Sequence, residues 1–206
     1  MERLGLTTAE VAFILTFAED AQRERALARL RITPEDTPDA VVQAGLSSLA
    51  VRGLVVGHGR EITLSPAVAT VLQGLAEPTL WVSINALTPD AADAAHLYVH
   101  GSGMFLLSPR AYGCFDVQGV RRGLTPSEIV GSVARRFVTE RRPAMVICQI
   151  DPATGDGSVG LFVDANGAAT TAVGETRTPA SSLDDALGAF GAALAAAAPA
   201  MAHTIA

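Results

Sequence analysis

The chain has 206 residues, of which 49% are hydrophobic, and its formal net charge is -6 with a pI near 5.1. This is enough apolar material for one or two folded domains, and the acidic balance argues against general affinity for nucleic acids or anionic membranes. Cys114 and Cys148 are too few and too far apart for a disulfide framework or a zinc site. We expect both thiols to be reduced and Cys148 to be buried.

All fifteen basic residues are arginine, which is typical of GC-rich genomes such as those of actinobacteria. Charged residues bracket the short apolar segment near the start of the chain, so we expect no signal peptide. The alanine-rich run 186–198 is interrupted by glycine and followed by Pro199, which favours a packed surface helix over a membrane span. The sequence therefore predicts a cytoplasmic protein that does not enter the membrane.

Helical patterns come first along the chain. Thr7 and Thr8, followed by Glu10, are typical of a helix start. A second start comes at Thr37-Pro38-Asp39, with proline expected at the first helical position. That helix ends at Gly53. A glycine turn at 57–59 predicts a hairpin, and Ser65-Pro66 begins a further helix.

This order, helices then a hairpin then a helix, predicts a winged-helix-like portion over residues 1–78. A DNA-reading helix needs an excess of basic residues for phosphates and polar side chains for base edges. Between residues 38 and 53 the charged residues are Asp39 and Arg52, which sum to zero. The helix therefore favours a fold-building role. A winged-helix transcription regulator with a C-terminal sensing domain remains the alternative.

Residues 79–206 have a strand-like pattern. We predict strands at 80–87, 95–100, 104–107, 114–120, 145–150, 159–163 and 169–173. The capping box Thr125-Pro126-Ser127-Glu128 predicts a helix over 126–140. Apolar spacing from Leu183 predicts a last helix, capped by Ser181 or Ser182. The fold class is therefore α+β: a helical, winged-helix-like portion followed by a largely antiparallel sheet covered by helices, with two half-units as one possibility. The two portions can also pack as one compact domain.

Motifs for catalysis are missing. Ser102 lies in His100-Gly101-Ser102-Gly103, which does not fit the Gly-x-Ser-x-Gly frame and is typical of a hairpin turn. The histidines lack metal-ligand spacing, and the loop 151–157 lacks the spacing of a calcium loop. A chain without lysine has no phosphate-binding Gly-Lys-Ser/Thr motif. We expect no catalytic residue, no metal and no cofactor.

Arginine pairs stand out between residues 121 and 142, where the formal sum is +4 in an acidic chain. One interpretation places Arg135 and Arg136 near a helix C-terminus, where the helix dipole favours cations. The other is an electropositive edge that guides an acidic protein partner, with aromatic residues as apolar anchors. The candidate partner-binding residues are Arg121, Arg122, Arg135, Arg136, Phe105, Tyr112 and Phe115.

Residues 49–84, "LAVRGLVVGHGREITLSPAVATVLQGLAEPTLWVSI", are followed by predicted hairpin strands, a covering helix, further strands and a C-terminal helix. This pattern resembles the EspG-type chaperones of the type VII (ESX) secretion system, which are usually longer. The resemblance implies a cytosolic protein that binds the apolar tip of a helical secretion substrate and keeps it soluble until export. The sequence therefore favours a protein-binding chaperone or adaptor, and an enzyme fits least. The oligomeric state is left open.

Overall fold

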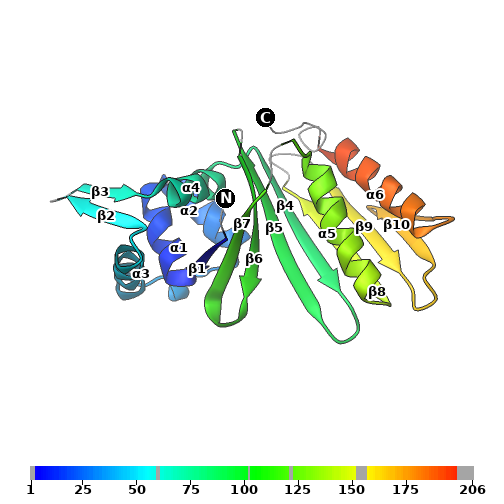
Figure 1. Ribbon diagram of the computed structural model, residues 1–206, viewed down its shortest axis with the longest axis horizontal. Helices are drawn as coiled ribbons and strands as arrows, with labels where there is room; N and C mark the ends of the chain where they lie inside the picture. Colours follow the sequence, from blue (N-terminus) through cyan, green and yellow to red (C-terminus); the bar gives the residue numbers. More distant parts are fainter. Residues whose placement is uncertain (1–2, 59–60, 102, 121–122, 152–156, 199–206) are drawn as a thin grey trace. The chain divides into compact units, whose positions relative to one another are not determined.

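A computed structural model of the chain describes residues 3–58, 61–101, 103–120, 123–151 and 157–198 (Figure 1). The fold is α+β with a large antiparallel sheet, as predicted. The chain forms two compact units: unit 1 is Met1–Pro78 with Leu107–Val120, and unit 2 is Thr79–Leu106 with Arg121–Ala206. Residues 107–120 group with unit 1 because a strand within them pairs with the N-terminal strand, so the units depart from the single boundary drawn at 78/79.

Unit 1 contains most of the short helices. Its elements are β1 (Leu4–Thr7), α1 (Thr8–Ile14), η1 (Leu15–Phe17), α2 (Asp20–Arg29), η2 (Pro34–Asp36), α3 (Asp39–Val51), β2 (Val55–His58), β3 (Glu61–Leu64), α4 (Pro66–Ala76), η3 (Ala111–Gly113) and β7 (Cys114–Gly119). The predicted order of helices, hairpin and helix is present. Pro38 caps α3 and Asp39 is its first residue, one position later than predicted, because the extended backbone of Pro38 does not yet enter the helix.

Strand β1 was not predicted from the sequence. It pairs antiparallel with β7, with Leu6 opposite Phe115 and Thr7 opposite Cys114. Within unit 1 the strand order is β1, β7 and then the part of β6 from residue 107 onward. Since β1 has only four residues, it is too short for an alternating pattern to be read from the sequence.

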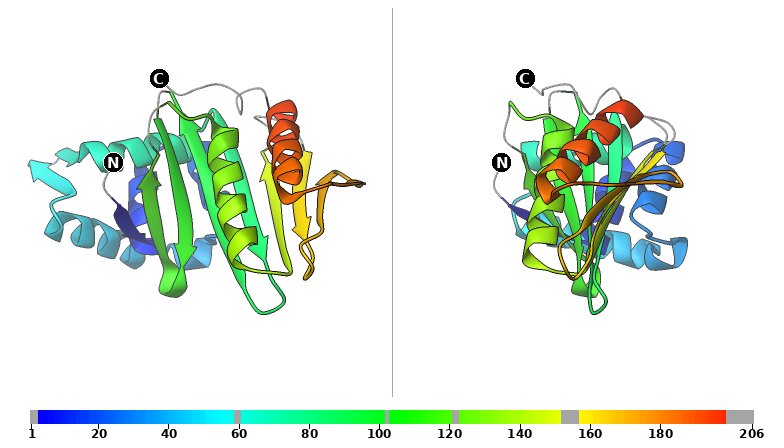
Figure 2. Two further views of the ribbon diagram at one scale, coloured as in Figure 1. Left: turned by 45° about the vertical axis from the view of Figure 1, so that its right-hand side comes forward. Right: turned by 90° about the vertical axis from the view of Figure 1, so that its right-hand side faces the viewer.

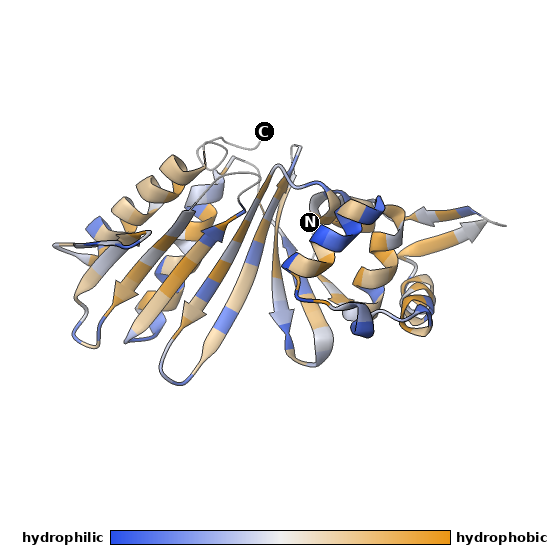
Figure 3. Ribbon diagram, turned by 180° about the vertical axis from the view of Figure 1, so that it is seen from behind, coloured by the Kyte–Doolittle hydropathy of each residue, from blue (hydrophilic) through white to orange (hydrophobic). Residues whose placement is uncertain are grey.

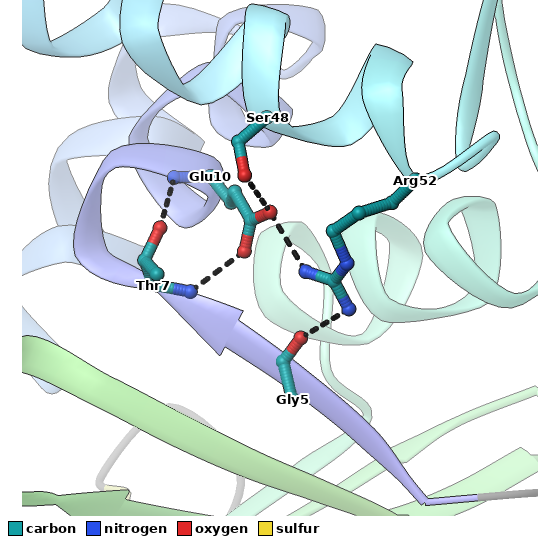
Figure 4. Close-up of polar contacts among 5 residues, drawn as sticks. All are labelled: Gly5, Thr7, Glu10, Ser48 and Arg52. Carbon is teal, nitrogen blue, oxygen red and sulfur yellow. Dashed lines mark hydrogen bonds and ion pairs between the residues drawn. The ribbon is translucent and has the colours of Figure 1, made fainter.

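A buried carboxylate joins α1 to α3 (Figure 4). Glu10 is 0% exposed, and its Oε2 accepts a hydrogen bond from the Thr7 backbone N–H at 2.8 Å. Its Oε1 accepts from Ser48 Oγ at 2.8 Å and from Arg52 Nη1 at 2.7 Å. Arg52 Nη2 also donates to the Gly5 carbonyl at 2.8 Å. These hydrogen bonds satisfy the buried charge of Glu10, a residue that the sequence places at a helix start. They also connect β1, α1 and α3.

Unit 2 is a sheet with two long helices. Its elements are β4 (Leu80–Leu87), β5 (Ala92–His100), β6 (Gly103–Arg110, which continues into unit 1 at residue 107), α5 (Pro126–Glu140), β8 (Ala144–Ile150), β9 (Gly157–Val163), β10 (Ala169–Val173), β11 (Thr176–Pro179) and α6 (Leu183–Ala197). The predicted helix 126–140 and its capping box are confirmed. Ser182 caps α6. Strand β11 was not predicted because its four exposed residues carry no apolar alternation.

The strand order in unit 2 is β6-β5-β4-β8-β9-β10-β11. In chain order, β4, β5, β6 and β7 precede α5, and β8 to β11 precede α6. The two groups of strands meet where β4 pairs antiparallel with β8. This arrangement matches the two half-units suggested by the order of predicted elements.

One face of the unit 2 sheet is covered by both helices, as Figure 2 shows. The register places Val82 and Ile84 of β4, Cys148 of β8 and Leu161 of β9 on this face, all buried. The predicted burial of Cys148 is confirmed, and burial raises the pKa of its thiol to about 12, so the thiol is inert at neutral pH. In the described part of the chain, no helix combines the length and apolar character needed to cross a bilayer.

Candidate functional site

Two of the four predicted arginine residues, Arg135 and Arg136, fall within the described part of the chain, and each forms an exposed ion pair. Arg121 and Arg122 lie outside the described residues. Arg135 Nη1 donates to Asp184 Oδ1 at 2.7 Å, which links α5 to α6, and Arg136 Nε donates to Glu140 Oε1 at 3.2 Å on the same helix. α5 ends at Glu140, as predicted, so Arg135 and Arg136 lie near its C-terminal end, although neither is in its last turn. Exposed ion pairs of this kind contribute little stability.

The three predicted aromatic anchors have different environments. Phe105 is buried and stacks on Tyr98, with ring centroids 5.2 Å apart. Phe115 is also a core residue, so neither ring is available to a partner, and the preference of aromatic residues on strands for the core accounts for both. Tyr112 is fully exposed.

A more coherent surface lies on the side of the unit 2 sheet opposite α5 and α6, which we call the open face. Figure 3 shows the strands of unit 2 from this side, with both helices behind them. Since side chains alternate along a strand, the register that buries Val82 and Ile84 beneath the helices turns Trp81, Ser83 and Asn85 outward.

Aromatic and polar side chains share the part of the open face on β4 and β5. Trp81 stacks on His96 with ring centroids 5.7 Å apart and an interplanar angle of 14°. Ser83 lies directly across from His96, and both are nearly buried. Asn85 Nδ2 donates to Ser83 Oγ at 3.1 Å.

Apolar side chains continue the open face across β8 and β9. Ile147 lies between Asn85 on β4 and Gly160 on β9, and Met145 pairs with Phe162. The Phe162 ring lies over Gly160, because a Cβ atom there would be only 2.9 Å from Cε2 of the ring. Met145, Ile147 and Phe162 are each partly exposed.

Arg177 of β11 lies at the end of this row of apolar side chains. Its Cζ atom lies 5.0 Å from the centroid of the Phe162 ring, a distance that allows a cation–π interaction. The strand pairings place a set of described residues on the open face. Of these residues, Arg177 alone carries a permanent formal charge. Trp, Met, Phe and Arg are enriched at the centres of protein interfaces, from which other charges are depleted. The open face therefore has the composition of a protein-binding surface.

Metal chemistry has no support in the described ranges, where no group of three or more His, Cys, Asp and Glu side chains is placed to hold an ion.

Comparison with protein-family models gives no match, and comparison with curated proteins gives none either.

Proposed function

We propose that this protein is a protein-binding chaperone or adaptor that uses the open face of unit 2. The observation that carries the proposal is the partly exposed, nearly uncharged stripe of Trp81, Met145, Ile147 and Phe162, with Arg177 at its end. Covering such a stripe removes apolar surface from water on both partners.

The mechanism is shielding of an apolar segment. In a central strand such as β8, both edges pair with neighbours, so the backbone is satisfied and recognition falls to side chains. These side chains stand on a rigid sheet, which lowers the entropy lost on binding. A secretion substrate with an exposed apolar helical tip fits this chemistry, as the resemblance to EspG-type chaperones implies. We place the protein in the cytoplasm, where the substrate would be held before export.

The alternative, a DNA-reading regulator, has less support from unit 1. Arg52 is the basic residue of the α3 region, and its guanidinium is bound by Glu10 and by the Gly5 carbonyl. Its charge therefore offsets a buried carboxylate instead of a phosphate. The exposed positions of α3 carry Asp39, alanines, Gln43, Ser47 and Val51. They provide too little positive charge for the salt-dependent binding that DNA requires.

A tagged pull-down from nuclease-treated native lysate tests the proposal. We expect a small helical protein to elute in near-stoichiometric amount, and Ile147→Glu to reduce its recovery at least ~tenfold, because the partner would have to bury a carboxylate against apolar side chains. The control Val173→Glu introduces the same charge on β10. Val173 is 52% exposed and, by its register with Val159, belongs to the opposite side of the sheet.

Both variants must retain the circular dichroism spectrum of the wild type. Equal recovery with Ile147→Glu and wild type would contradict the proposed surface. If no protein elutes and the untreated lysate shows retention on DNA at low salt, the regulator becomes the better explanation.

A further inference from the structure

Tyr112 occupies the turn between β6 and β7 in unit 1. Its side chain is 101% exposed, so the ring gains nothing from packing within the chain. Its backbone has φ 62° and ψ 32°, the left-handed region that asparagine and glycine enter most readily and that a bulky residue rarely adopts.

Neither stability nor turn geometry accounts for a tyrosine here. Gly113 follows with φ 65°, so two residues in succession have positive φ, a conformation for which Asn-Gly is a favoured pair. A tyrosine at the first of these positions strains the backbone and exposes an aromatic ring to water. Strain of this kind at an exposed residue indicates a role in contact with another molecule.

The turn is held in place from outside the hairpin. Thr8 Oγ1 donates to the Gly113 carbonyl at 3.0 Å. A Cβ atom at Gly113 would lie 2.8 Å from this Thr8 Oγ1 atom. The first residue of α1 therefore fixes the position of the turn. An exposed ring on a fixed turn loses little conformational entropy when it is bound, which is the property of an interface anchor.

Two arginine side chains lie close to the turn end of the hairpin. Arg110 Nε and Arg3 Nη2 both donate to Asp116 Oδ2, at 2.9 and 2.8 Å. Two guanidinium groups therefore share this carboxylate, and the arginine side chains remain 43% and 67% exposed. A partner with carboxylates around an apolar pocket matches a tyrosine beside exposed guanidinium groups. One ring and this modest charge are too little for a membrane surface, which needs a broad apolar face and several cations.

We propose that Tyr112 is a preformed anchor for a protein partner, inserting its ring into an apolar pocket whose rim carries Asp or Glu. This contact belongs to unit 1 and is additional to the open face of unit 2. The phenol hydroxyl remains able to hydrogen-bond at the mouth of the pocket, as interface tyrosines do.

Photo-crosslinking tests the anchor. A benzophenone amino acid in place of the exposed Ala111 keeps Tyr112 and samples its surroundings in native lysate. We expect cross-links to a discrete partner peptide in which apolar residues are flanked by Asp or Glu. When Tyr112→Asn is combined with this substitution, the cross-linking yield is expected to fall at least ~tenfold. This is the loss expected when an aromatic hot-spot residue is truncated. Val51→Asn removes another highly exposed apolar side chain of unit 1 (90%) and is expected to leave the yield unchanged.

Thermal unfolding separates binding from folding. Because asparagine suits the left-handed conformation, Tyr112→Asn is expected to unfold at the wild-type temperature or above it. Absence of a cross-link that depends on Tyr112 would overturn the proposal, as would cross-linked peptides of basic composition. Flotation with vesicles of phosphatidylcholine and phosphatidylglycerol that depends on Tyr112 would also overturn it, in favour of a lipid contact.

Discussion

Replacing Gly45 by alanine is expected to destabilise unit 1 by ~2 kcal/mol or more. A Cβ atom at this position of α3 would lie 2.0 Å from the Ala9 carbonyl oxygen and 2.5 Å from its carbon. These are backbone atoms of α1, so the helices would have to separate. Overpacking typically costs ~1–3 kcal/mol, and a backbone contact this short belongs at the upper end, even after the ~1 kcal/mol that alanine gains over glycine in a helix.

Hydrogen exchange followed by mass spectrometry measures this effect locally, which is needed because two units need not unfold in one step. We expect faster exchange in α1 and α3. Gly131→Ala in α5 is the matched control: a Cβ atom there meets nothing within 4 Å, so helix propensity alone predicts a gain of ~0.5–1 kcal/mol. Equal behaviour of the two variants would show that α1 and α3 are not in close contact at Gly45.

Local sequence signals were sufficient to predict the starts of α5 and α6, because a capping residue determines the backbone conformation at a helix start. The capping box at Thr125 begins α5 where predicted, and Ser182 caps α6. The pairing of β1 with β7 could not be predicted, because it joins Leu6 to Phe115 and depends on contacts that short patterns do not encode. For the same reason the sequence did not reveal that Leu107–Val120 groups with unit 1.

The candidate site was harder to predict than the fold. Alternation in "LWVSINAL" separates Leu80, Val82 and Ile84 from Trp81 and Ser83, so the sequence does contain two sides of a strand. It does not state which side α5 covers, because both sides carry apolar residues. The arginine pairs drew attention because charge is conspicuous in sequence, yet Arg135 forms an ion pair with Asp184 of α6, a partner that only tertiary structure brings near.

Glu10→Ala is expected to destabilise unit 1 by ~3 kcal/mol. The substitution leaves the Thr7 N–H, the Ser48 hydroxyl and the Arg52 guanidinium without their acceptor. Breaking a buried ion pair costs ~3–5 kcal/mol, and the lower end applies because Arg52 is 39% exposed and regains water. Urea denaturation at neutral pH, followed by hydrogen exchange in α1 and α3, measures the loss. Glu24→Ala, which removes an exposed carboxylate from α2, should stay near the wild type.

Glu10→Gln isolates the charge, since glutamine also completes a capping box. Burial on its own raises the pKa of Glu10, but hydrogen bonds from Thr7, Ser48 and Arg52, with the charge of Arg52, outweigh it and lower the pKa below its ordinary value of 4.5. A carboxyl group whose pKa is lower in the folded state binds its proton more readily when unfolded, so its contribution is complete above pH 4.5 and disappears as pH falls through the folded pKa. Other carboxyl groups titrate in both proteins, so the difference in unfolding free energy between wild type and Glu10→Gln reports Glu10 alone. We expect this difference to be constant near neutral pH and to shrink below pH 4.5; a difference that persists in acid would mean that packing, and not the ionised carboxylate, joins α1 to α3.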